Sequence, residues 1–553
     1  MGNSVSNTGG VIRKIGLPIL FVILGGGAIA LSIRSLFVAG IGWDSTFDTY
    51  ATTVARGIDG SSTLREAYDA IPVTTEFYGL VVYQLAEFLH TSLTSSADPL
   101  APYDLSTYVW QGAVTLSFAG IAATALALSV WVAWRSLFTA TFTWAALLTL
   151  PNWLGAGTIN YKDMPVASGL TLLSAGLGVA LVVAVQETNG RSREKTWWLV
   201  AAMMFAAIGS SIAIGTRAGA LFIAAGIMVF ALLVSAGMAL RLRSRQVLVI
   251  PASVGMIAAV VPIVFLWFSN PVARISLPFW LKDSLDYSTG DFPWTLTMRT
   301  AGMDVANNAL PWWYIPAWLF ARLPLIMSFL AIAGVIAGIV TLVMRRFRSR
   351  SLLILIPFVA QGLLIPAGLV VLNSTLYDEI RHLQFIYPAI ILIGAYGVFF
   401  WRESGFPALI RIGVQALAVV VVLVNLYWVV QWFPYSYAFV NPIAKGTSTE
   451  RNWDLDYWGV SAREGVEKLK ELGYQDIVVV PHGEPGRPYG GQNLGDPGGG
   501  VIDTGFTPIA GERFAYYWFE RFEFPFSEFE CNELFVIERV GKTLGRGGVC
   551  TPN

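Results

Sequence analysis

Three short polar clusters contain the side chains whose types and spacing could do chemistry. The first contains Asp44 and Asp48, the second is the string 160–165 (NYKDMP), and the third is the string 377–382 (YDEIRH). A carboxylate that is half desolvated becomes more basic and can accept a proton from a hydroxyl group. Asp44 and Asp48 are therefore candidate general bases. Asp44 is the first choice because it lies nearer to the preceding hydrophobic segment.

The second and third clusters have the composition of an anion-binding site. Lys162 beside Asp163 at a helix N-terminus would suit a phosphate or a metal-phosphate group. Arg381 and His382 could donate hydrogen bonds to a phosphate, and arginine favours bidentate binding. Two further basic residues could join them or could only be interfacial anchors, namely Arg217 and Arg299.

Each cluster also has a purely structural explanation. Asp44 could cap a helix or be an interfacial charge. Asp163 could be an N-cap with Pro165 in the first helical turn, although this does not explain Lys162. The string 377–382 could be a salt-bridged turn between two helices. The residue types alone leave these alternatives open.

The three polar clusters lie between long hydrophobic segments, which must position them. The 553 residues are 55% hydrophobic and only 13% charged, against about 25% charged in ordinary soluble domains. This composition excludes a soluble enzyme, and a net charge of zero gives no sign of nucleic-acid binding. A bilayer-spanning helix needs roughly 20 apolar residues. About eleven runs approach this length, the shortest being 137–150: 15–38, 106–133, 137–150, 165–185, 197–215, 218–240, 247–269, 325–344, 352–372, 384–401 and 410–432.

The placement of basic residues predicts the orientation. Lys and Arg gather on the cytoplasmic side of membrane spans, and here they precede the first span and recur in every second connection. The N-terminus is therefore expected in the cytoplasm, and the first span is expected to be retained because no small-residue cleavage site follows it. The protein is predicted to lie in a plasma or inner membrane. The connections on the extracytoplasmic face would be 39–105, 151–164, 270–324 and 373–383, followed by the tail. Amphipathic helices near 74–94 and 312–323 would lie at the interface.

The tail forms a second predicted domain, 434–553, after a membrane module of residues 1–433. Residues 461–474 have the pattern of an amphipathic helix, and 476–480 and 534–540 of strands. The only two cysteines, Cys531 and Cys550, lie here. An extracytoplasmic compartment is oxidising, so we predict a disulfide. The predicted fold is an α-helical polytopic membrane protein with a small extracytoplasmic α/β domain.

Together the clusters resemble a known family. Asp44, the strings 160–165 and 377–382, and three further strings resemble the C-type (GT-C), multi-span glycosyltransferases that use polyprenyl-phosphate sugars. The three further strings are 215–217 (GTR), 311–316 (PWWYIP) and 452–459 (NWDLDYWG). That group includes protein O-mannosyltransferases and the lipid A aminoarabinose transferase. The first-loop motif departs from the mannosyltransferase pattern, because Ser45 follows Asp44 where that family has adjacent Asp and Glu.

The resemblance implies inverting transfer of a sugar on the extracytoplasmic face to a glycan, lipid or protein acceptor. Asp44 or Asp48 would be the base. Lys162, Arg381 and His382 would neutralise charge on the leaving lipid phosphate, with Asp163 orienting Lys162 or holding a divalent cation, Mg²⁺ or Mn²⁺. The donor-phosphate set also includes Arg217 and Arg299. Residues expected near the acceptor or at the rim of the site are Glu76, Tyr161, Tyr377, Asp378 and Trp458.

Two other functions compete with this interpretation. A ligase or polymerase of lipid-diphosphate glycans would share the architecture. A transporter or flippase would place ionisable residues near the bilayer midplane, commonly in two matching halves. The predicted spans here are almost uncharged and no internal repeat is visible, which disfavours transport.

Overall fold

The computed structural model describes most of the chain. The described residues are 5–42, 45, 79–94, 100, 105–186, 192–289, 296–344, 349–403, 405–446, 451–474, 477–480, 513–521 and 529–552. Asp44, Asp48 and Glu76 lie outside them.

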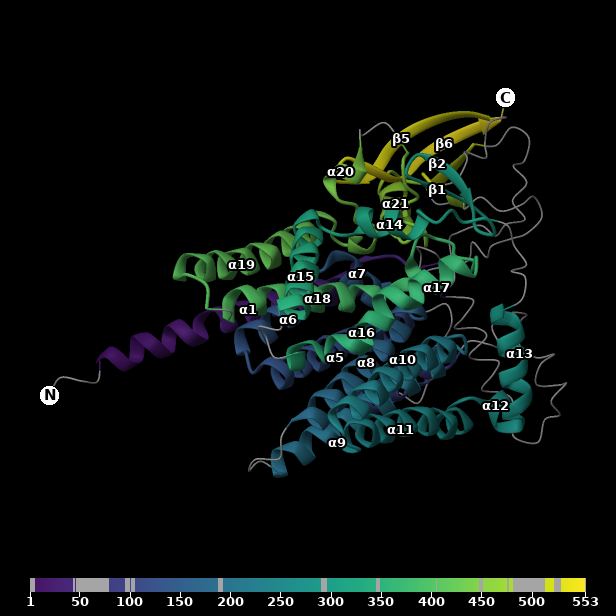
Figure 1. Ribbon diagram of the computed structural model, residues 1–553. Coiled ribbons are helices and arrows are strands. Elements are labelled where there is room, and N and C mark those ends of the chain that lie inside the picture. Colours follow the sequence, from purple (N-terminus) through teal and green to yellow (C-terminus); the bar gives the residue numbers. More distant parts are fainter. Residues whose placement is uncertain are drawn as a thin grey trace.

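Eight of the described helices are long and apolar enough to cross a membrane. Each coincides with a predicted span, and Figure 1 shows them as a bundle with the C-terminal strands at one end. The chain is thus a multi-pass integral membrane protein. The eight are α1 (Val5–Val38), α5 (Leu105–Trp134), α8 (Asp163–Val185), α9 (Ser192–Thr216), α10 (Ala220–Leu242), α11 (Gln246–Ser269), α15 (Leu325–Met344) and α19 (Ala408–Gln431).

The other three predicted spans are shorter or interrupted helices. The run 137–150 gives α6 (Leu137–Leu148), which has 12 residues, followed by the buried α7 (Pro151–Ile159). The run 352–372 is broken by a π-turn, η2 (Ala360–Leu364), between α16 (Leu355–Val359) and α17 (Ile365–Val371). The run 384–401 gives α18 (Ile386–Glu403), whose last two residues are charged. Helices α6, α7 and α18 are mostly buried inside the bundle, whereas Pro366 is the one buried residue of α17.

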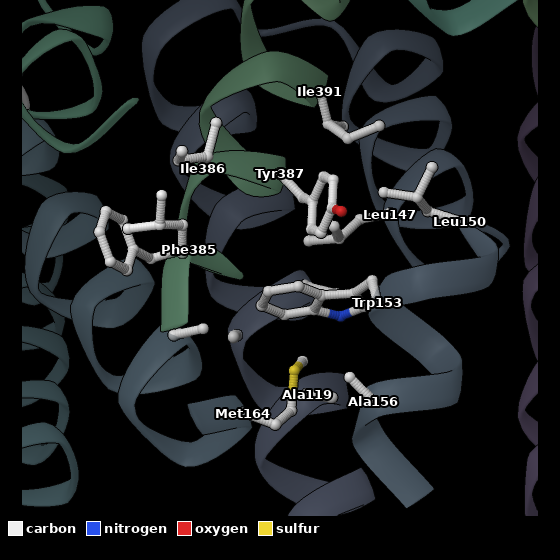
Figure 2. Close-up of a cluster of buried hydrophobic side chains, with 14 of the residues drawn as sticks. Ala119, Leu147, Leu150, Trp153, Ala156, Met164, Phe385, Ile386, Tyr387 and Ile391 are labelled. Atoms are coloured by element: carbon white, nitrogen blue, oxygen red, sulfur yellow. The ribbon is translucent and has the colours of Figure 1, made fainter. Parts of the chain in front are cut away.

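Helix α8 forms the centre of the bundle. Its apolar window is entirely buried, which a sequence with no charge after Asp163 allows. It packs on α9 at very short range, because a Cβ atom on Gly169 would lie 2.4 Å from the Gly209 carbonyl oxygen. Small residues permit such close approach between membrane helices. Figure 2 shows the adjoining core, to which α6, α7, α8 and α18 contribute Leu147, Trp153, Met164 and Tyr387.

The C-terminal domain contains a four-stranded sheet in the order β3-β4-β6-β5, with only the β3–β4 pair parallel. Its strands are β3 (Ile477–Val480), β4 (Phe514–Phe519), β5 (Phe529–Arg539) and β6 (Lys542–Pro552), and α21 (Ala462–Glu471) packs against it. The predicted helix 461–474 and both predicted strands are confirmed. The disulfide is confirmed as well, because Cys531 on β5 is bonded to Cys550 opposite it on β6.

A hairpin from the membrane module joins this domain. Strands β1 (Thr297–Thr300) and β2 (Met303–Ala306) pair with each other, and Thr300 forms a further bridge with Trp453. Helix α14 (Tyr314–Arg322) matches the predicted helix 312–323, but its Trp318 is buried against Trp453 rather than exposed at an interface. Helix α4 (Val81–Thr94) matches part of the helix predicted near 74–94.

Short elements complete the described chain. They are α12 (Pro271–Ile275), α13 (Leu277–Thr289), η1 (Ser349–Leu352), η3 (Arg381–Leu383), η4 (Ser436–Ala438) and α20 (Pro442–Lys445).

Candidate active site

The first turn of α8 presents Asp163 for interactions other than capping. The Asn160 side chain accepts hydrogen bonds from the backbone N–H groups of Asp163 (2.7 Å) and Lys162 (3.3 Å). Asn160 therefore satisfies two backbone N–H groups at this helix start, as short polar residues do. The alternative in which Asp163 is itself the N-cap is wrong, and its carboxylate remains available for partners from other helices.

Two arginines from distant segments surround the Asp163 carboxylate. Arg217, directly after α9, lies 3.0 Å from Oδ1, and Arg381 of η3 lies 3.8 Å from Oδ2. The Asn160 amide donates to Oδ2 at 3.0 Å. The Asp163 and Arg381 side chains are 2% and 1% exposed. Buried charges persist only when they are paired and hydrogen-bonded, and this arrangement satisfies that condition.

His382 and Lys162 lie beside the two arginines. Lys162, Arg217, Arg381 and His382, grouped around Asp163, form the cationic cluster. The charges of Asp163, Arg381 and Lys162 all act on His382. Burial lowers the pKa of His382 well below its usual value, the Asp163 carboxylate opposes this shift, and the neighbouring cations reinforce it. At neutral pH His382 is therefore an uncharged hydrogen-bonding group, whereas Lys162 is a buried amine on α8's N-terminal turn.

The structure thus brings four of the five predicted phosphate-binding residues together, namely Lys162, Arg217, Arg381 and His382. The fifth, Arg299, lies on β1 and has different neighbours. Its guanidinium pairs with Asp304 (3.0 Å) and donates to the Arg451 carbonyl (3.1 Å). The first contact lies within the hairpin, and the second joins the hairpin to the C-terminal domain.

The turn before η3 is held by two further arginines. Asp378 and Glu379 both have positive φ angles, 52° and 63°, a conformation that costs a non-glycine residue roughly 1 kcal/mol or more. Asp378 pairs with Arg521 of the C-terminal domain and lies 3.4 Å from Arg381. The buried Glu379 pairs with Arg322 of α14. These pairs hold the turn that directs Arg381 into the cluster.

Aromatic rings enclose the Arg381 guanidinium. Its carbon lies 4.7 Å from the ring centre of Tyr377, 5.3 Å from Trp458 and 5.9 Å from Tyr457. The Tyr377 ring also contacts His382, with centroids 4.7 Å apart. Cations over aromatic faces are stabilised, most strongly when desolvated. Trp458, predicted to lie near the acceptor, is therefore in direct contact with the cluster.

The end of the first span lies against Trp458. The Gly40 N–H donates to the Val460 carbonyl at 3.0 Å, and a Cβ atom on Gly42 would lie 3.2 Å from the Trp458 ring. Gly40 also lines a small cleft between α1, α5 and α7 that is bordered by Tyr161. Tyr161 is buried there and donates to the Tyr108 carbonyl at 3.3 Å. Gly40 and Gly42, which follow the first span, therefore contact the loop whose Trp458 ring packs on Arg381.

Asp456 holds the loop that carries Trp458 and was not anticipated. This buried carboxylate accepts hydrogen bonds from the backbone N–H groups of Val460 (2.8 Å) and Ser461 (3.1 Å) and from the Tyr437 hydroxyl. Arg322 and Arg521 were missed too. Isolated arginines have no motif, whereas the spacing of an Asp and a Gly in 456–459 could have indicated a turn.

A divalent cation is not favoured at Asp163. Among the described residues, no group of three or more His, Cys, Asp or Glu side chains could hold a metal ion. The neighbours of the Asp163 carboxylate are two guanidinium groups and an amide. This donor set does not suit Mg²⁺ or Mn²⁺, which prefer oxygen ligands.

No sequence family and no curated protein matches the chain. Comparison with solved structures finds ArnT from Cupriavidus metallidurans, bound to undecaprenyl phosphate, at 13% identity. The match covers 96% of this chain and 98% of that one, with a TM-score of 0.50. The chain has the ArnT fold.

The resemblance predicted from the motifs is therefore confirmed for the fold. The ArnT fold extends across both the membrane helices and the C-terminal domain, since the match covers nearly all of each chain. The oligosaccharyltransferase of Archaeoglobus fulgidus, in its apo form, is a more distant neighbour, at 12% identity and a TM-score of 0.44, covering 83% of this chain and 62% of that one.

Proposed function

We propose that the protein is an integral membrane glycosyltransferase that moves a sugar from a polyprenyl-monophosphate donor to an acceptor on the extracytoplasmic face. The observation that carries the proposal is the buried cationic cluster at Asp163. It lies at the helix ends beneath the disulfide-bonded domain, in a fold shared with a protein that was crystallised with undecaprenyl phosphate.

The cluster suits a lipid phosphate. Arg217 and Arg381 are preorganised by Asp163, and Lys162 adds a third positive charge beside them. Fixed cations in a desolvated site stabilise charge that develops on a leaving group far better than cations in water do. His382 would contribute a neutral hydrogen bond to the same phosphate.

The proposed reaction is a single inverting displacement. The acceptor oxygen attacks the anomeric carbon, and the bond between that carbon and the phosphate oxygen breaks. The phosphate retains the bonding electrons, and a carboxylate removes the proton of the acceptor. Asp44 is the proposed base, with Asp48 as the alternative. The contact between Gly42 and Trp458 supports this assignment because it brings the preceding backbone next to the ring that covers Arg381.

The disulfide supports an extracytoplasmic site. Disulfides persist in oxidising compartments, and the sheet that contains Cys531–Cys550 belongs to the same domain as Arg521, which binds the turn before η3. The N-terminus would then be cytoplasmic and the C-terminal domain extracytoplasmic.

Transfer from labelled undecaprenyl-monophosphate sugars, measured with the purified protein in lipid, tests the proposal. Arg381→Gln should lower the transfer rate at least 100-fold, because a desolvated phosphate contact is lost. Arg402→Gln is the matched control. Arg402 donates to Ser136 at the opposite end of the bundle, and its replacement should leave the rate within about twofold.

Three results would contradict the proposal. The first is equal rates in the parent protein and Arg381→Gln. The second is a requirement for a diphosphate-linked glycan, which would indicate a ligase or polymerase. The third is movement of the intact lipid-linked sugar between leaflets without transfer, which would indicate a flippase.

A further inference from the structure

Two neighbouring aromatic residues in the loop after Asp456 contain buried polar hydrogens that no described group accepts. Tyr457 and Trp458 are each 1% exposed. The Tyr457 hydroxyl and the Trp458 Nε1 make no hydrogen bond within the described part of the chain. Leaving such a group unpaired in the interior is costly, and most buried polar atoms do find a partner. Two adjacent exceptions therefore require an explanation.

Both side chains face the cationic cluster. The Arg381 guanidinium carbon lies 5.3 Å from the Trp458 ring centre and 5.9 Å from the Tyr457 ring centre. Burial raises the pKa of the Tyr457 phenol well above its usual value, and the Glu379 carboxylate raises it further. Tyr457 is therefore protonated at any physiological pH and acts as a hydrogen-bond donor, as the indole N–H of Trp458 always does.

The backbone, rather than these polar atoms, holds the two side chains in place. Asp456 accepts hydrogen bonds from the N–H groups of Val460 and Ser461. Arg521 donates to the Tyr457 carbonyl at 2.7 Å and also binds Asp378. The phenol and the indole N–H are thus held on the loop without being used within it, so a ligand that enters beside the loop would meet two unused donors.

We propose that Tyr457 and Trp458 form the subsite for the transferred sugar, with the Tyr457 hydroxyl and the Trp458 Nε1–H donating hydrogen bonds to sugar oxygens. This inference rests on the proposed function. A sugar is the chemistry that fits because its hydroxyls and ring oxygen accept hydrogen bonds, and its C–H face packs on an aromatic ring. An isoprenoid chain has no acceptors, and the phosphate already has the cations around Arg381.

Access to the subsite requires the loop that carries both residues to move away from Arg381. The closed arrangement covers both polar atoms, and the Arg521 contacts with Asp378 and the Tyr457 carbonyl join the loop to the turn before η3. Entry of the sugar would lengthen these contacts.

Binding of bare and sugar-loaded lipid provides the test. The probes are undecaprenyl phosphate alone and a panel of undecaprenyl-monophosphate sugars carrying a hexose, an N-acetylhexosamine or an aminopentose. Native mass spectrometry of the intact protein measures the affinity for each. The unmodified protein should bind at least one loaded lipid more tightly than the bare lipid. Tyr457→Phe should lower that preference about tenfold, the size of effect expected for a lost hydrogen bond, with little change in affinity for bare lipid.

Stability measurements separate ligand binding from a structural role. Removal of an unpaired buried hydroxyl should leave the unfolding midpoint of Tyr457→Phe unchanged or raise it. For Trp458→Phe, the matched control is Trp432→Phe. Trp432 is also fully buried with an Nε1 that has no described partner, but its ring contacts Phe439. Both substitutions should lower the midpoint similarly, and only Trp458→Phe should lower the preference for loaded lipid.

The outcomes distinguish this inference from the proposed function. The subsite is overturned if the unmodified protein does not discriminate between bare and loaded lipids, or if both Tyr457→Phe and Trp458→Phe retain the preference. Failure of the unmodified protein to bind undecaprenyl phosphate at all would overturn the proposed function and the subsite with it.

Discussion

The two ends of the helix bundle use the same charged residue types in opposite ways. At one end, Arg135 and Glu194 form a 2.7 Å ion pair whose side chains are 40% and 35% exposed. At the other end, Asp163 and Arg381 are almost completely buried. Exposed pairs contribute about 0–1 kcal/mol, whereas buried charges are stable only inside a complete network. The difference indicates that the exposed end anchors helices, whereas the buried end has the properties expected of a site.

Asp163→Asn should have the largest effect on stability. It removes the carboxylate that pairs with both the buried Arg381 and the half-buried Arg217, and it leaves Asp378 as the acid next to Arg381. Breaking a buried pair in this way typically costs about 3–5 kcal/mol. The unfolding midpoint measured in detergent should fall by several degrees. Glu194→Gln removes the acid of the exposed pair and serves as the control. Equal decreases of the unfolding midpoint in the two variants would mean that the buried network contributes no more to stability than the exposed pair.

The pH dependence of stability should report on Asp456, near the site. Burial raises the pKa of Asp456 to about 6, although hydrogen bonds from Ser461 and Tyr437 oppose the shift. A carboxyl group with a higher pKa in the folded state stabilises the fold fully below its unfolded pKa, near 4, and this contribution is lost as the pH rises through about 6. Asp456→Asn should flatten the midpoint profile between pH 4 and 6. An unchanged slope would show that Asp456 does not titrate there.

Arg521→Gln tests whether the C-terminal domain supports the buried end. The substitution removes the contacts of Arg521 with Asp378 and the Tyr457 carbonyl. Because these contacts hold the turn that positions Arg381, we expect the transfer rate to fall about tenfold. Arg546→Gln is a matched control on β6, where Arg546 pairs with Glu520 and Glu533. Arg521→Lys should recover part of the rate because the charge is restored. Equal losses in Arg521→Gln and Arg546→Gln would indicate a general weakening of the sheet.

The smallest effect is expected at the exposed end. A double-mutant cycle with Arg135→Gln and Glu194→Gln should give a coupling energy below about 1 kcal/mol. The coupling should shrink further in 0.5 M salt, since exposed pairs are screened. A coupling of several kcal/mol would remove the contrast between the two ends.

Much of the architecture could be predicted from local sequence. Runs of apolar residues predicted the eight long spans, and the amphipathic pattern of 461–474 predicted α21. Whether the short run 137–150 forms a complete membrane span could not be predicted from hydropathy. A 12-residue helix is stable there because α1, α5 and α18 surround it, and hydropathy does not describe such packing.

The site was only partly visible in the sequence. Lys162, Asp163, Arg381 and His382 lie in compact strings, so their chemistry could be recognised before their positions were known. Arg521 could not be recognised, because it lies 143 residues from Asp378 and belongs to no motif. The roles of Asp44, Asp48 and Glu76, which lie outside the described residues, stay predictions.

The sequence by itself determined the membrane class, the segregation of charge and the disulfide. These follow from the apolarity of single segments, the placement of Lys and Arg, and the presence of only two cysteines, both in the tail. Only the tertiary structure decided which arginine pairs with which carboxylate and which polar groups remain unpaired. The physical reason is that Coulomb energy and desolvation depend on three-dimensional proximity and burial. The packing of α8 against α9 and of the C-terminal domain over Arg381 determines both.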